Sequence, residues 1–423
     1  MATATGVAAR AGRAPALRKA LSSLRAYRYR VPYCVPQWSG ATVWALFRSL
    51  LTGRVAEGSA PARLARRLEA QLGRPVVPCA NGRTAVELAL RGLGVGAGSE
   101  VVLPSFCCTS IVPPVRAVGA VPVLADVGPE LNVTPDTIET ALTSRTRAVI
   151  VPHLFGNPAD IEGIRARCHP RGIVVIDDAA QAMGATLEGR PLGTFGDAGI
   201  VSFGNGKVCF GTGGGALLSS RPEVVAFAVG WVLPRSGIGA IGAHALSVLL
   251  WRRWRRSLLP VRMALRKLQG NPPAAPPYHA QAMANLDAEV ALTLLEHLGR
   301  DLPARRARVS AYVAALSEEP RLSLVAHRPG SACLTQVVVI DGDAPGSGAA
   351  PRVIAALRSA GYEVERSYVP LHLRAEPELA KPGALPLTER LWSSLVELPC
   401  EPSVPLTDVA RICEIVRETL RRS

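Results

Sequence analysis

A single lysine in a glycine-bounded loop is the residue with the clearest chemical potential in this chain. Lys207 ends the segment VSFGNGK at 201–207, and the glycine-rich run GTGGGA follows at 211–216. Upstream, the β-branched segment VVIDD at 174–178 ends in Asp178. A carboxylate at a strand end can hold a pyridinium nitrogen protonated, while a lysine amine forms a Schiff base with an aldehyde. The pair predicts pyridoxal 5'-phosphate (PLP) as the cofactor; the alternative is a surface lysine in a glycine turn.

Length and charge restrict the classes of partner. The 423 residues are enough for two domains, and 48% hydrophobic against 19% charged residues predicts a substantial core. The formal net charge of +15 favours an anionic partner, such as a phosphorylated substrate, a nucleotide, a membrane surface or a nucleic acid. Lys and Arg are spread along the chain without a nucleic-acid-binding motif, so we expect no nucleic-acid partner.

The cysteines and apolar segments indicate a cytoplasmic protein. The nine cysteines are an odd number without CxxC spacing, which predicts neither a disulfide framework nor a metal site. The basic N-terminus lacks a continuous apolar stretch of the kind found in secretory signals. No run of apolar residues is long enough for a transmembrane helix.

Strand and helix patterns alternate along the first half of the chain. Helical spacing occurs at 62–72, 84–93, 111–118, 135–142 and 159–167, and short apolar strands are expected at 76–77, 101–103, 121–124, 148–151 and 173–176. This alternation predicts an α/β fold with a mostly parallel, helix-covered sheet. Ligands bind at the carboxyl ends of such strands, which is where Asn81, Ser105, His153 and Asp178 fall.

The domain organisation follows from these patterns. We expect a flexible basic extension over residues 1–30, a large domain over 31–300 with an atypical basic insertion at about 231–278, and a smaller C-terminal α+β domain over 301–423. The evidence for the last is helical spacing at 283–298, 305–316, 351–360 and 406–420, with strands at 322–326 and 335–340.

Several motifs, taken in order, resemble a known family. They are HLFGNPAD at 153–160, DDAAQAMGA at 177–185, GTFGDA at 193–198, Lys207 after Ser202-Phe203, and YVPLH at 368–372. This set resembles the DegT/DnrJ/EryC1/StrS family of PLP-dependent sugar aminotransferases, which have the type I PLP-dependent transferase fold. The resemblance runs from about residue 78 to 216 and resumes over 283–298 and the C-terminal domain.

The resemblance implies roles for individual residues. Lys207 would form the Schiff base and later move the substrate proton, and Asp178 would pair with the pyridine nitrogen. Gln181 would sit near the ring or its phenolic oxygen. Ser202, Gly82 and Arg83 would contact the phosphate, the last two from a turn that opens a helix. The alternatives are a helix-capping role for the carboxylates, a plain helix position for Gln181, and a solvated Arg83.

Other positions either depart from the family's sequence pattern or are expected, by resemblance, to contact the substrate. Cys108 stands where the family often stacks an aromatic ring on the cofactor, so either a thin residue covers the ring or Phe106 helps. Residues 278–283, YHAQAM, lack the Asn and Arg of the family's GYNYRM, and Gly213 replaces an acid. By resemblance, His153, Tyr368 and His372 would contact the substrate.

The insertion has no counterpart in the family. Leu246, Leu250, Trp254 and Leu258 recur at helical spacing, with Arg252, Arg253, Arg255 and Arg256 on the other sides. Three interpretations stay open: residues 246–268 lie on an anionic membrane surface, cover a diphosphate-bearing substrate, or pack on the domain with a solvated basic face.

Together these observations predict an enzyme class. We expect a PLP-dependent aminotransferase that converts a keto sugar, nucleotide-linked, to an amino sugar with an amino-acid donor such as glutamate or glutamine, and that forms a homodimer. The alternatives are a cyclitol or other natural-product ketone as substrate, and a non-catalytic PLP-binding regulatory homologue.

Overall fold

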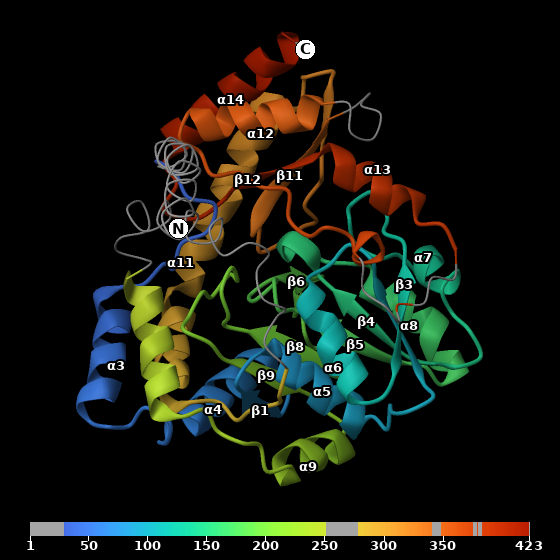
Figure 1. The fold of residues 1–423 in the computed structure, drawn as a ribbon, viewed down its shortest axis with the longest axis vertical. Helices are drawn as coiled ribbons and strands as arrows, with labels where there is room; N and C mark the ends of the chain where they lie inside the picture. The colour runs from blue at the N-terminus through green and yellow to red at the C-terminus, as the bar shows by residue number, and fades with distance from the viewer. Residues whose placement is uncertain (1–28, 251–277, 341–347, 375–378, 380–382, 423) are drawn as a thin grey trace, which may run out of the picture.

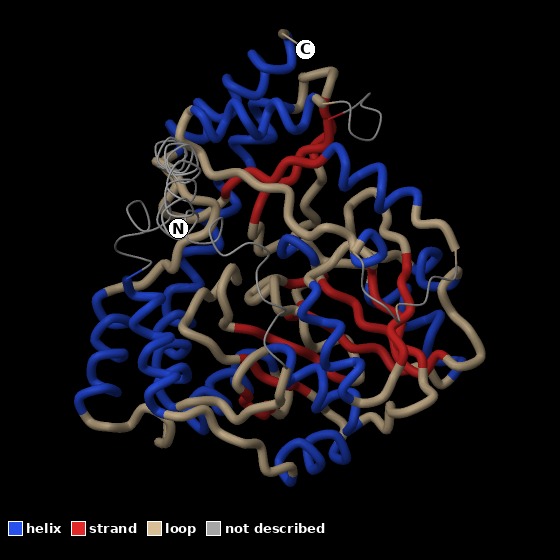
Figure 2. The backbone as a smooth tube through the Cα atoms, in the orientation of Figure 1, coloured by secondary structure: helices blue, strands red, loops and turns tan. Residues whose placement is uncertain are grey.

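The centre of the molecule is a seven-stranded sheet sandwiched between helices (Figures 1 and 2). The computed structural model describes residues 29–250, 278–340, 348–374, 379 and 383–422. The strand order is β1-β9-β8-β5-β4-β2-β3. The strands are β1 (Val76–Cys79), β2 (Glu100–Pro104), β3 (Val121–Ala125), β4 (Thr146–Pro152), β5 (Val174–Asp178), β8 (Ala198–Ser202) and β9 (Gly215–Leu218). Only β9 runs against the others, so the predicted α/β class with a mostly parallel sheet is confirmed.

Continuous apolar strands give the sheet two buried faces. Side chains alternate across a strand, so Val101 and Leu103 of β2 point to one face and Val102 to the other. One face belongs to a core that includes α5 (Gly82–Gly92), α6 (Val112–Ala117) and α9 (Pro222–Gly230). The opposite core includes α3 (Gly40–Leu51), α4 (Ala60–Leu72), α8 (Ile161–Cys168) and the first half of α11 (Asn285–Leu316). Burial on both faces fixes the sheet's carboxyl edge between two rigid layers.

Short elements connect these layers. They are η1 (Thr109–Ile111), α7 (Pro135–Glu139), η2 (Leu154–Gly156), η3 (His169–Arg171) and the hairpin β6 (Thr186–Leu187) with β7 (Arg190–Pro191). None of the helices in the described ranges is both long enough and apolar enough to cross a membrane.

The C-terminal part is a three-stranded antiparallel sheet covered by helices. The sheet has the order β10 (Leu322–Leu324), β11 (Thr335–Ile340) and β12 (Leu395–Pro399). Its core holds α12 (Ala349–Ser359) and α14 (Leu406–Arg421), while η4 (Leu371–Leu373) and α13 (Pro386–Ser394) lie towards the large sheet. The helix α11 is continuous through Pro303 and contributes Val309, Tyr312 and Leu316 to this core. The expected boundary at 300/301 therefore lies inside one helix.

Residues 29–33 pack on the C-terminal part. Tyr29 is buried, and the backbone N–H groups of Arg30 and Val31 donate to the Gly361 carbonyl at 2.6 and 3.1 Å. Val31 also pairs with Tyr362 as an isolated bridge. The packed chain thus includes Tyr29 and Arg30, which the sequence analysis assigned to the extension; residues 1–28 of that extension lie outside the described residues.

The insertion is described only at its ends. Residues 238–250 form a helix that buries Ile241, Ala245 and Val248. Leu246 and Leu250, which the sequence analysis placed on the apolar stripe, are instead exposed. The arginines at 252, 253, 255 and 256 lie outside the described residues.

Candidate functional site

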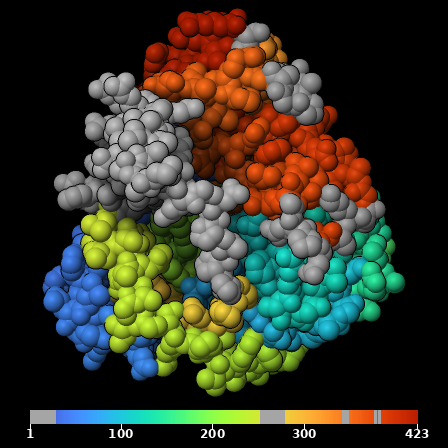
Figure 3. Space-filling view, viewed as in Figure 1, coloured from blue at the N-terminus to red at the C-terminus, as the bar shows by residue number. Residues whose placement is uncertain are grey.

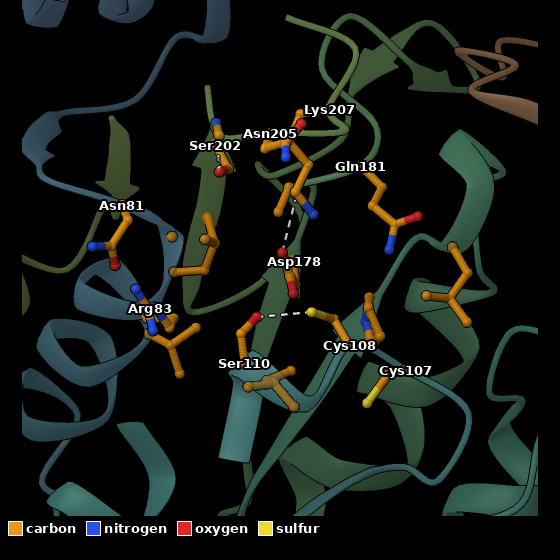
Figure 4. Close-up of a pocket in the computed structure, with 18 residues that line it drawn as sticks. Asn81, Arg83, Cys107, Cys108, Ser110, Asp178, Gln181, Ser202, Asn205 and Lys207 are labelled. Atoms are coloured by element: carbon orange, nitrogen blue, oxygen red, sulfur yellow. Dashed lines mark hydrogen bonds between the residues drawn. The ribbon is translucent and has the colours of Figure 1, made fainter. Parts of the chain in front are cut away.

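A cavity of about 280 Å³ opens at the carboxyl edge of the large sheet (Figure 4). Asn81 follows β1, Asp178 ends β5 and Ser202 ends β8, and these strands run in the same direction, so their ends meet. Seven of the ten residues predicted for the site line the cavity: Gly82, Arg83, Cys108, Asp178, Gln181, Ser202 and Lys207. His153, Tyr368 and His372 do not.

Asp178 is a partly buried carboxyl that lines this cavity. The Ala180 N–H donates to its Oδ1 at 3.0 Å, and no described residue donates to its Oδ2. Burial raises the pKa of the Asp178 carboxyl, while the Ala180 bond and the nearby Lys207 ammonium act in the opposite direction. The free oxygen is therefore an acceptor in a low-dielectric site, where a cationic N–H would be bound tightly.

Lys207 lies above Asp178, on a loop whose ends are pinned (Figure 4). The Phe203 carbonyl accepts from the Gly211 N–H at 2.9 Å, and the Phe210 carbonyl accepts from the Trp38 indole N–H at 2.8 Å. Lys207 makes no hydrogen bond or ion pair with any described residue. Its amine is thus held in the cavity without a competing partner.

Sequence reasoning missed one residue that supports this loop. Asp287 of α11 accepts a 2.5 Å hydrogen bond at Oδ1 from the Thr212 hydroxyl, and burial raises the pKa of its carboxyl. An added Cβ at Gly213 would lie 3.1 Å from the Asp287 Oδ2. The Asp287 carboxyl therefore occupies space that a side chain at position 213 would need. Gly213, where the family has an acid, was the feature of the sequence that could have indicated this contact.

An anion cradle forms where α5 begins. Asn81 caps the helix with its Oδ1, which accepts from the Thr84 N–H at 3.0 Å. The N–H groups of Gly82 and Arg83 have no acceptor among the described residues, and the Ser202 hydroxyl faces them. Free N–H groups and the helix dipole bind phosphate well at such a terminus.

Glycines allow this close packing. An added Cβ at Gly215 would lie 2.6 Å from the Asn81 carbonyl carbon and 2.7 Å from the Gly82 nitrogen. The glycine run after Lys207 therefore lets β9 lie directly beneath the cradle. A Cβ at Gly82 would meet the Ser202 Cβ at 3.5 Å, which is ordinary contact, but it would fill the cradle itself.

Residues 278–283 pack against the same helix terminus. The Arg83 guanidinium lies 5.5 Å from the Tyr278 ring centroid, a cation–π distance. The Gln281 side-chain oxygen accepts from the Ser236 hydroxyl at 2.9 Å, and its backbone carbonyl accepts from the Ala80 N–H at 3.0 Å. The segment that departs from the family is thus fastened to its own chain beside the cradle.

Gln181 closes the opposite side of the cavity (Figure 4). Its Oε1 accepts from the Phe155 N–H at 3.0 Å and its Nε2 donates to the Tyr368 hydroxyl at 3.2 Å. Burial raises the pKa of Tyr368 well above its usual range, so the phenol stays neutral. Tyr368 has a left-handed backbone (φ 51°), which is uncommon for a non-glycine residue and is held here by its neighbours.

Cys108 lines the cavity at the position where the family often stacks an aromatic ring on the cofactor. Its Sγ lies 2.9 Å from the Ser110 Oγ. Phe106 is fully buried against Phe155 and Tyr368 and does not line the cavity. Of Cys108 and Phe106, only the small Cys108 side chain therefore faces the cavity.

Two histidines expected at the substrate have internal positions instead. His153 is fully buried; its Nδ1 accepts from the Ala159 N–H at 2.9 Å, so its Nε2–H donates to Asp177 Oδ1 at 2.7 Å. His372 lies between the Ser105 hydroxyl at 2.6 Å and Glu389 at 3.1 Å, fastening η4 to the end of β2. With their ring nitrogens occupied, both position other elements around the cavity.

Known proteins share this architecture. The model of the DegT/DnrJ/EryC1/StrS aminotransferase family matches residues 41–417. The crystal structure of an aminotransferase, TlmJ, from Streptoalloteichus hindustanus superimposes with a TM-score of 0.73 and 25% identity, covering 93% of this chain and 99% of that one. The predicted type I fold is confirmed by this likeness.

Two of the sequence relatives are named for different kinds of substrate. An L-glutamine:2-deoxy-scyllo-inosose aminotransferase from Streptomyces kanamyceticus is 40% identical over 197 residues, 44% of this chain and 46% of the relative, so this match spans less than half of that protein. A dTDP-3-amino-3,4,6-trideoxy-alpha-D-glucose transaminase from Micromonospora megalomicea subsp. nigra is 31% identical over 354 residues, 80% of this chain and 84% of the relative. With the family model matching nearly the whole described chain, the protein belongs to the DegT/DnrJ/EryC1/StrS aminotransferase family.

Proposed function

We propose that this protein is a PLP-dependent aminotransferase that converts a nucleotide-linked keto sugar to an amino sugar. The observation that carries the proposal is the convergence of Lys207, Asp178 and the helix terminus at Gly82 on one cavity. The long match to a dTDP-sugar transaminase supports the substrate class. The donor is an amino acid such as glutamate or glutamine.

The cavity fits PLP in three places. The unpartnered Oδ2 of Asp178 suits a pyridine N–H, the free N–H groups of Gly82 and Arg83 with the Ser202 hydroxyl suit a phosphate, and the unpaired Lys207 amine suits an aldehyde. When bound, PLP would supply an electrophilic carbon for amines and an electron sink for the carbanion of the donor.

The chain's own side chains then have distinct tasks. Asp178 would accept a hydrogen bond from the ring nitrogen of the cofactor and favour its protonated form. Lys207 Nζ would move the proton at the α-carbon of the donor amino acid. Gln181, with both ends of its amide held by Phe155 and Tyr368, forms a fixed polar wall on one side. Cys108 presents a small side chain to the cavity.

A cyclitol ketone is the second candidate substrate. It is favoured by the 2-deoxy-scyllo-inosose aminotransferase relative, whose match is higher in identity but shorter. Parallel assays with nucleotide-linked keto sugars and with keto-cyclitols, using glutamine and glutamate in turn, separate the two. Turnover of either class would exclude a purely regulatory, non-catalytic protein.

The test of the cofactor assignment is spectroscopic. The purified protein should show a visible absorbance band that borohydride abolishes, with PLP left covalently attached to the peptide that contains Lys207. Lys207→Ala should bind PLP without that attachment and lack transamination. If the wild-type protein binds no PLP, the assignment is wrong.

Assembly and location are further parts of the proposal. We infer a homodimer from the family, and the segment 278–283 beside the cradle is where a partner would approach. Sedimentation that shows a monomer with full activity would contradict this.

All nine cysteines are free thiols, which supports a cytoplasmic location. Association of 246–268 with a membrane surface stays a prediction, since only 246–250 lies within the described residues.

A further inference from the structure

Three arginines without an ion-pair partner gather beside the loop that precedes β8. Arg74 lies between α4 and β1, Arg165 lies in α8 and Arg190 lies in β7. The Nη2 groups of Arg74 and Arg190 both donate to the Thr194 carbonyl oxygen, that of Arg74 at 2.7 Å. Two donors on one oxygen lie within about 6 Å of each other, so two positive charges are held side by side. We call Arg74, Arg165 and Arg190 the arginine cluster.

The third arginine adds a charge without making a bond. Arg165 forms no hydrogen bond or ion pair with any described residue, and its Nε is buried without an acceptor. Burial lowers the pKa of the Arg74 guanidinium, and the charges of Arg190 and Arg165 lower it further, so the field of Arg165 reaches the other two. A buried donor without an acceptor costs stability. The position of Arg165 is therefore unfavourable unless an anion joins it.

Acidic side chains in the described part of the chain do not neutralise the cluster. Asp177 acts on Arg74 through its charge, but its two oxygens already accept from a histidine and from a backbone N–H. Glu69 accepts from a backbone N–H at 3.1 Å, and the exposed Glu188 forms no ion pair with a described residue. Three guanidinium charges near one carboxylate leave two positive charges uncompensated.

Most donors of the cluster remain available. A guanidinium has five N–H donors, and the described bonds use two on Arg74, two on Arg190 and none on Arg165. All three side chains are half-buried, and the Ser220 hydroxyl, which accepts from Arg74, belongs to an exposed residue. A ligand could thus enter from solvent. Several acceptor oxygens and two negative charges are the properties of a phosphate group, whose oxygens guanidinium groups bind in pairs.

We propose that the arginine cluster binds a phosphate group, as inorganic phosphate or as the phosphate of a small metabolite. The dianion would match the two uncompensated charges and would give the buried Arg165 donor an acceptor. This site is distinct from the cradle at Gly82, and no residue of the arginine cluster lines the cavity. The inference therefore does not depend on the reaction proposed above.

The test is calorimetric titration of the PLP-saturated protein with inorganic phosphate, at an ionic strength kept constant with sodium chloride. Saturation with PLP keeps the cradle occupied, so added phosphate reports on a second site. The wild type should bind one phosphate per chain. Arg165→Gln should bind it at least about 10-fold more weakly, because a charge-assisted hydrogen bond is lost. Without phosphate this variant should melt no lower than the wild type, because it breaks no described hydrogen bond and relieves repulsion among like charges.

Titration with glycerol 3-phosphate separates the two sources of the phosphate group. Binding comparable to that of inorganic phosphate, and weakened by Arg165→Gln to the same extent, would show that the site accepts the phosphate of a metabolite. Binding of inorganic phosphate alone would show a site for the free anion. Either result supports the arginine cluster as a phosphate site.

A matched control uses an arginine in the same kind of setting. Arg417 of α14 is also half-buried on a helix and makes no hydrogen bond or ion pair with a described residue. The dark red α14 forms the top of the molecule in Figures 1 and 3, whereas α4 and β1, which flank Arg74, lie near the bottom of Figure 1. Arg417→Gln should bind phosphate as the wild type does.

Three results would overturn the proposal. The first is a PLP-saturated wild type that binds no phosphate. The second is equal phosphate binding by Arg165→Gln and Arg417→Gln, which would reduce the effect to net charge. The third is a melting temperature of phosphate-free Arg165→Gln several degrees below that of the wild type, which would show that Arg165 already has a structural partner.

Discussion

A fully buried glutamate in the C-terminal sheet should make the stability of this protein depend on pH near neutrality. Glu397 lies in β12, where its Oε1 accepts from the Ser367 N–H at 2.6 Å and its Oε2 accepts from the Ser367 hydroxyl at 2.7 Å and from the Tyr33 hydroxyl. Despite these donors, burial raises the pKa of Glu397 from its ordinary 4.5 to about 7, and the neighbouring Glu365 adds to the rise.

The direction of the pH effect follows from the raised pKa. Between pH 4.5 and about 7 the folded protein binds a proton at Glu397 that the unfolded chain releases, so stability falls as pH rises through this interval. Each pH unit in the interval lowers the free energy of unfolding by about 1.4 kcal/mol, which makes the whole loss about 3 kcal/mol. Glu397→Gln keeps the shape and stays neutral, and the Tyr33 and Ser367 hydroxyls can rotate to accept from its amide.

Thermal unfolding of the two proteins at pH 5 and pH 8 measures this effect. The variant should be close to the wild type at pH 5 and should melt roughly 3 to 6 °C higher at pH 8. Glu318→Gln, which removes a charge from an exposed position of the chain, should show no such divergence. A melting-temperature difference that is the same at both pH values would refute the reasoning, and a variant that loses stability relative to wild type as pH rises would show that Glu397 is ionised and anchored.

Three substitutions at the cavity test its geometry. Asp178→Asn should weaken PLP binding roughly 10- to 100-fold, because a charge-assisted hydrogen bond is worth about 1.5 to 3 kcal/mol. The cofactor-free variant should melt no lower than the cofactor-free wild type at pH 8, because it lacks a carboxyl whose pKa is raised by burial. Gly82→Ala should leave the melting temperature of the cofactor-free protein unchanged but weaken binding of PLP and of inorganic phosphate by about 10-fold, because the methyl group fills the cradle without a clash; equal binding would place the phosphate elsewhere. Gly215→Ala should instead destabilise the cofactor-free fold by about 1 to 3 kcal/mol in thermal unfolding, as its Cβ meets the backbone at Asn81, and an unchanged melting temperature would show that β9 can move away.

The parallel part of the fold could be predicted because its strands are continuous apolar runs. Every predicted strand and helix between residues 62 and 178 is present, within a few residues at its ends. The prediction did not include β8 and β9, which contain glycines and small residues and adjoin the Lys207 loop. It also missed α3, since Thr42, Ala45 and Ser49 give its buried side too little hydrophobicity for the periodicity to stand out.

Residues whose roles depend on long-range partners were the hardest to place from sequence. Asp287 supports the Lys207 loop from α11, far along the chain, and only the glycine at 213 hinted at it. The N-terminal segment at 29–33 gave no sign that it would join the C-terminal sheet, because a bridge between Val31 and Tyr362 has no local pattern. By contrast, Gly82, Arg83 and Ser202 follow strand ends, and parallel topology alone brings such residues together.

The neighbouring aspartates at 177 and 178 show how one motif serves both fold and site. Successive side chains of a strand point to opposite faces, so only one of the two can face the cavity. Asp178 does so, whereas Asp177 is buried and holds His153 Nε2 at 2.7 Å and the Phe195 N–H at 2.8 Å. These bonds tie the end of β4 and the loop before β8 to β5, and thereby fix the register that aims Asp178 at the cavity. Through Asp177, the histidine of the HLFG segment thus helps to hold the end of β5 that carries Asp178.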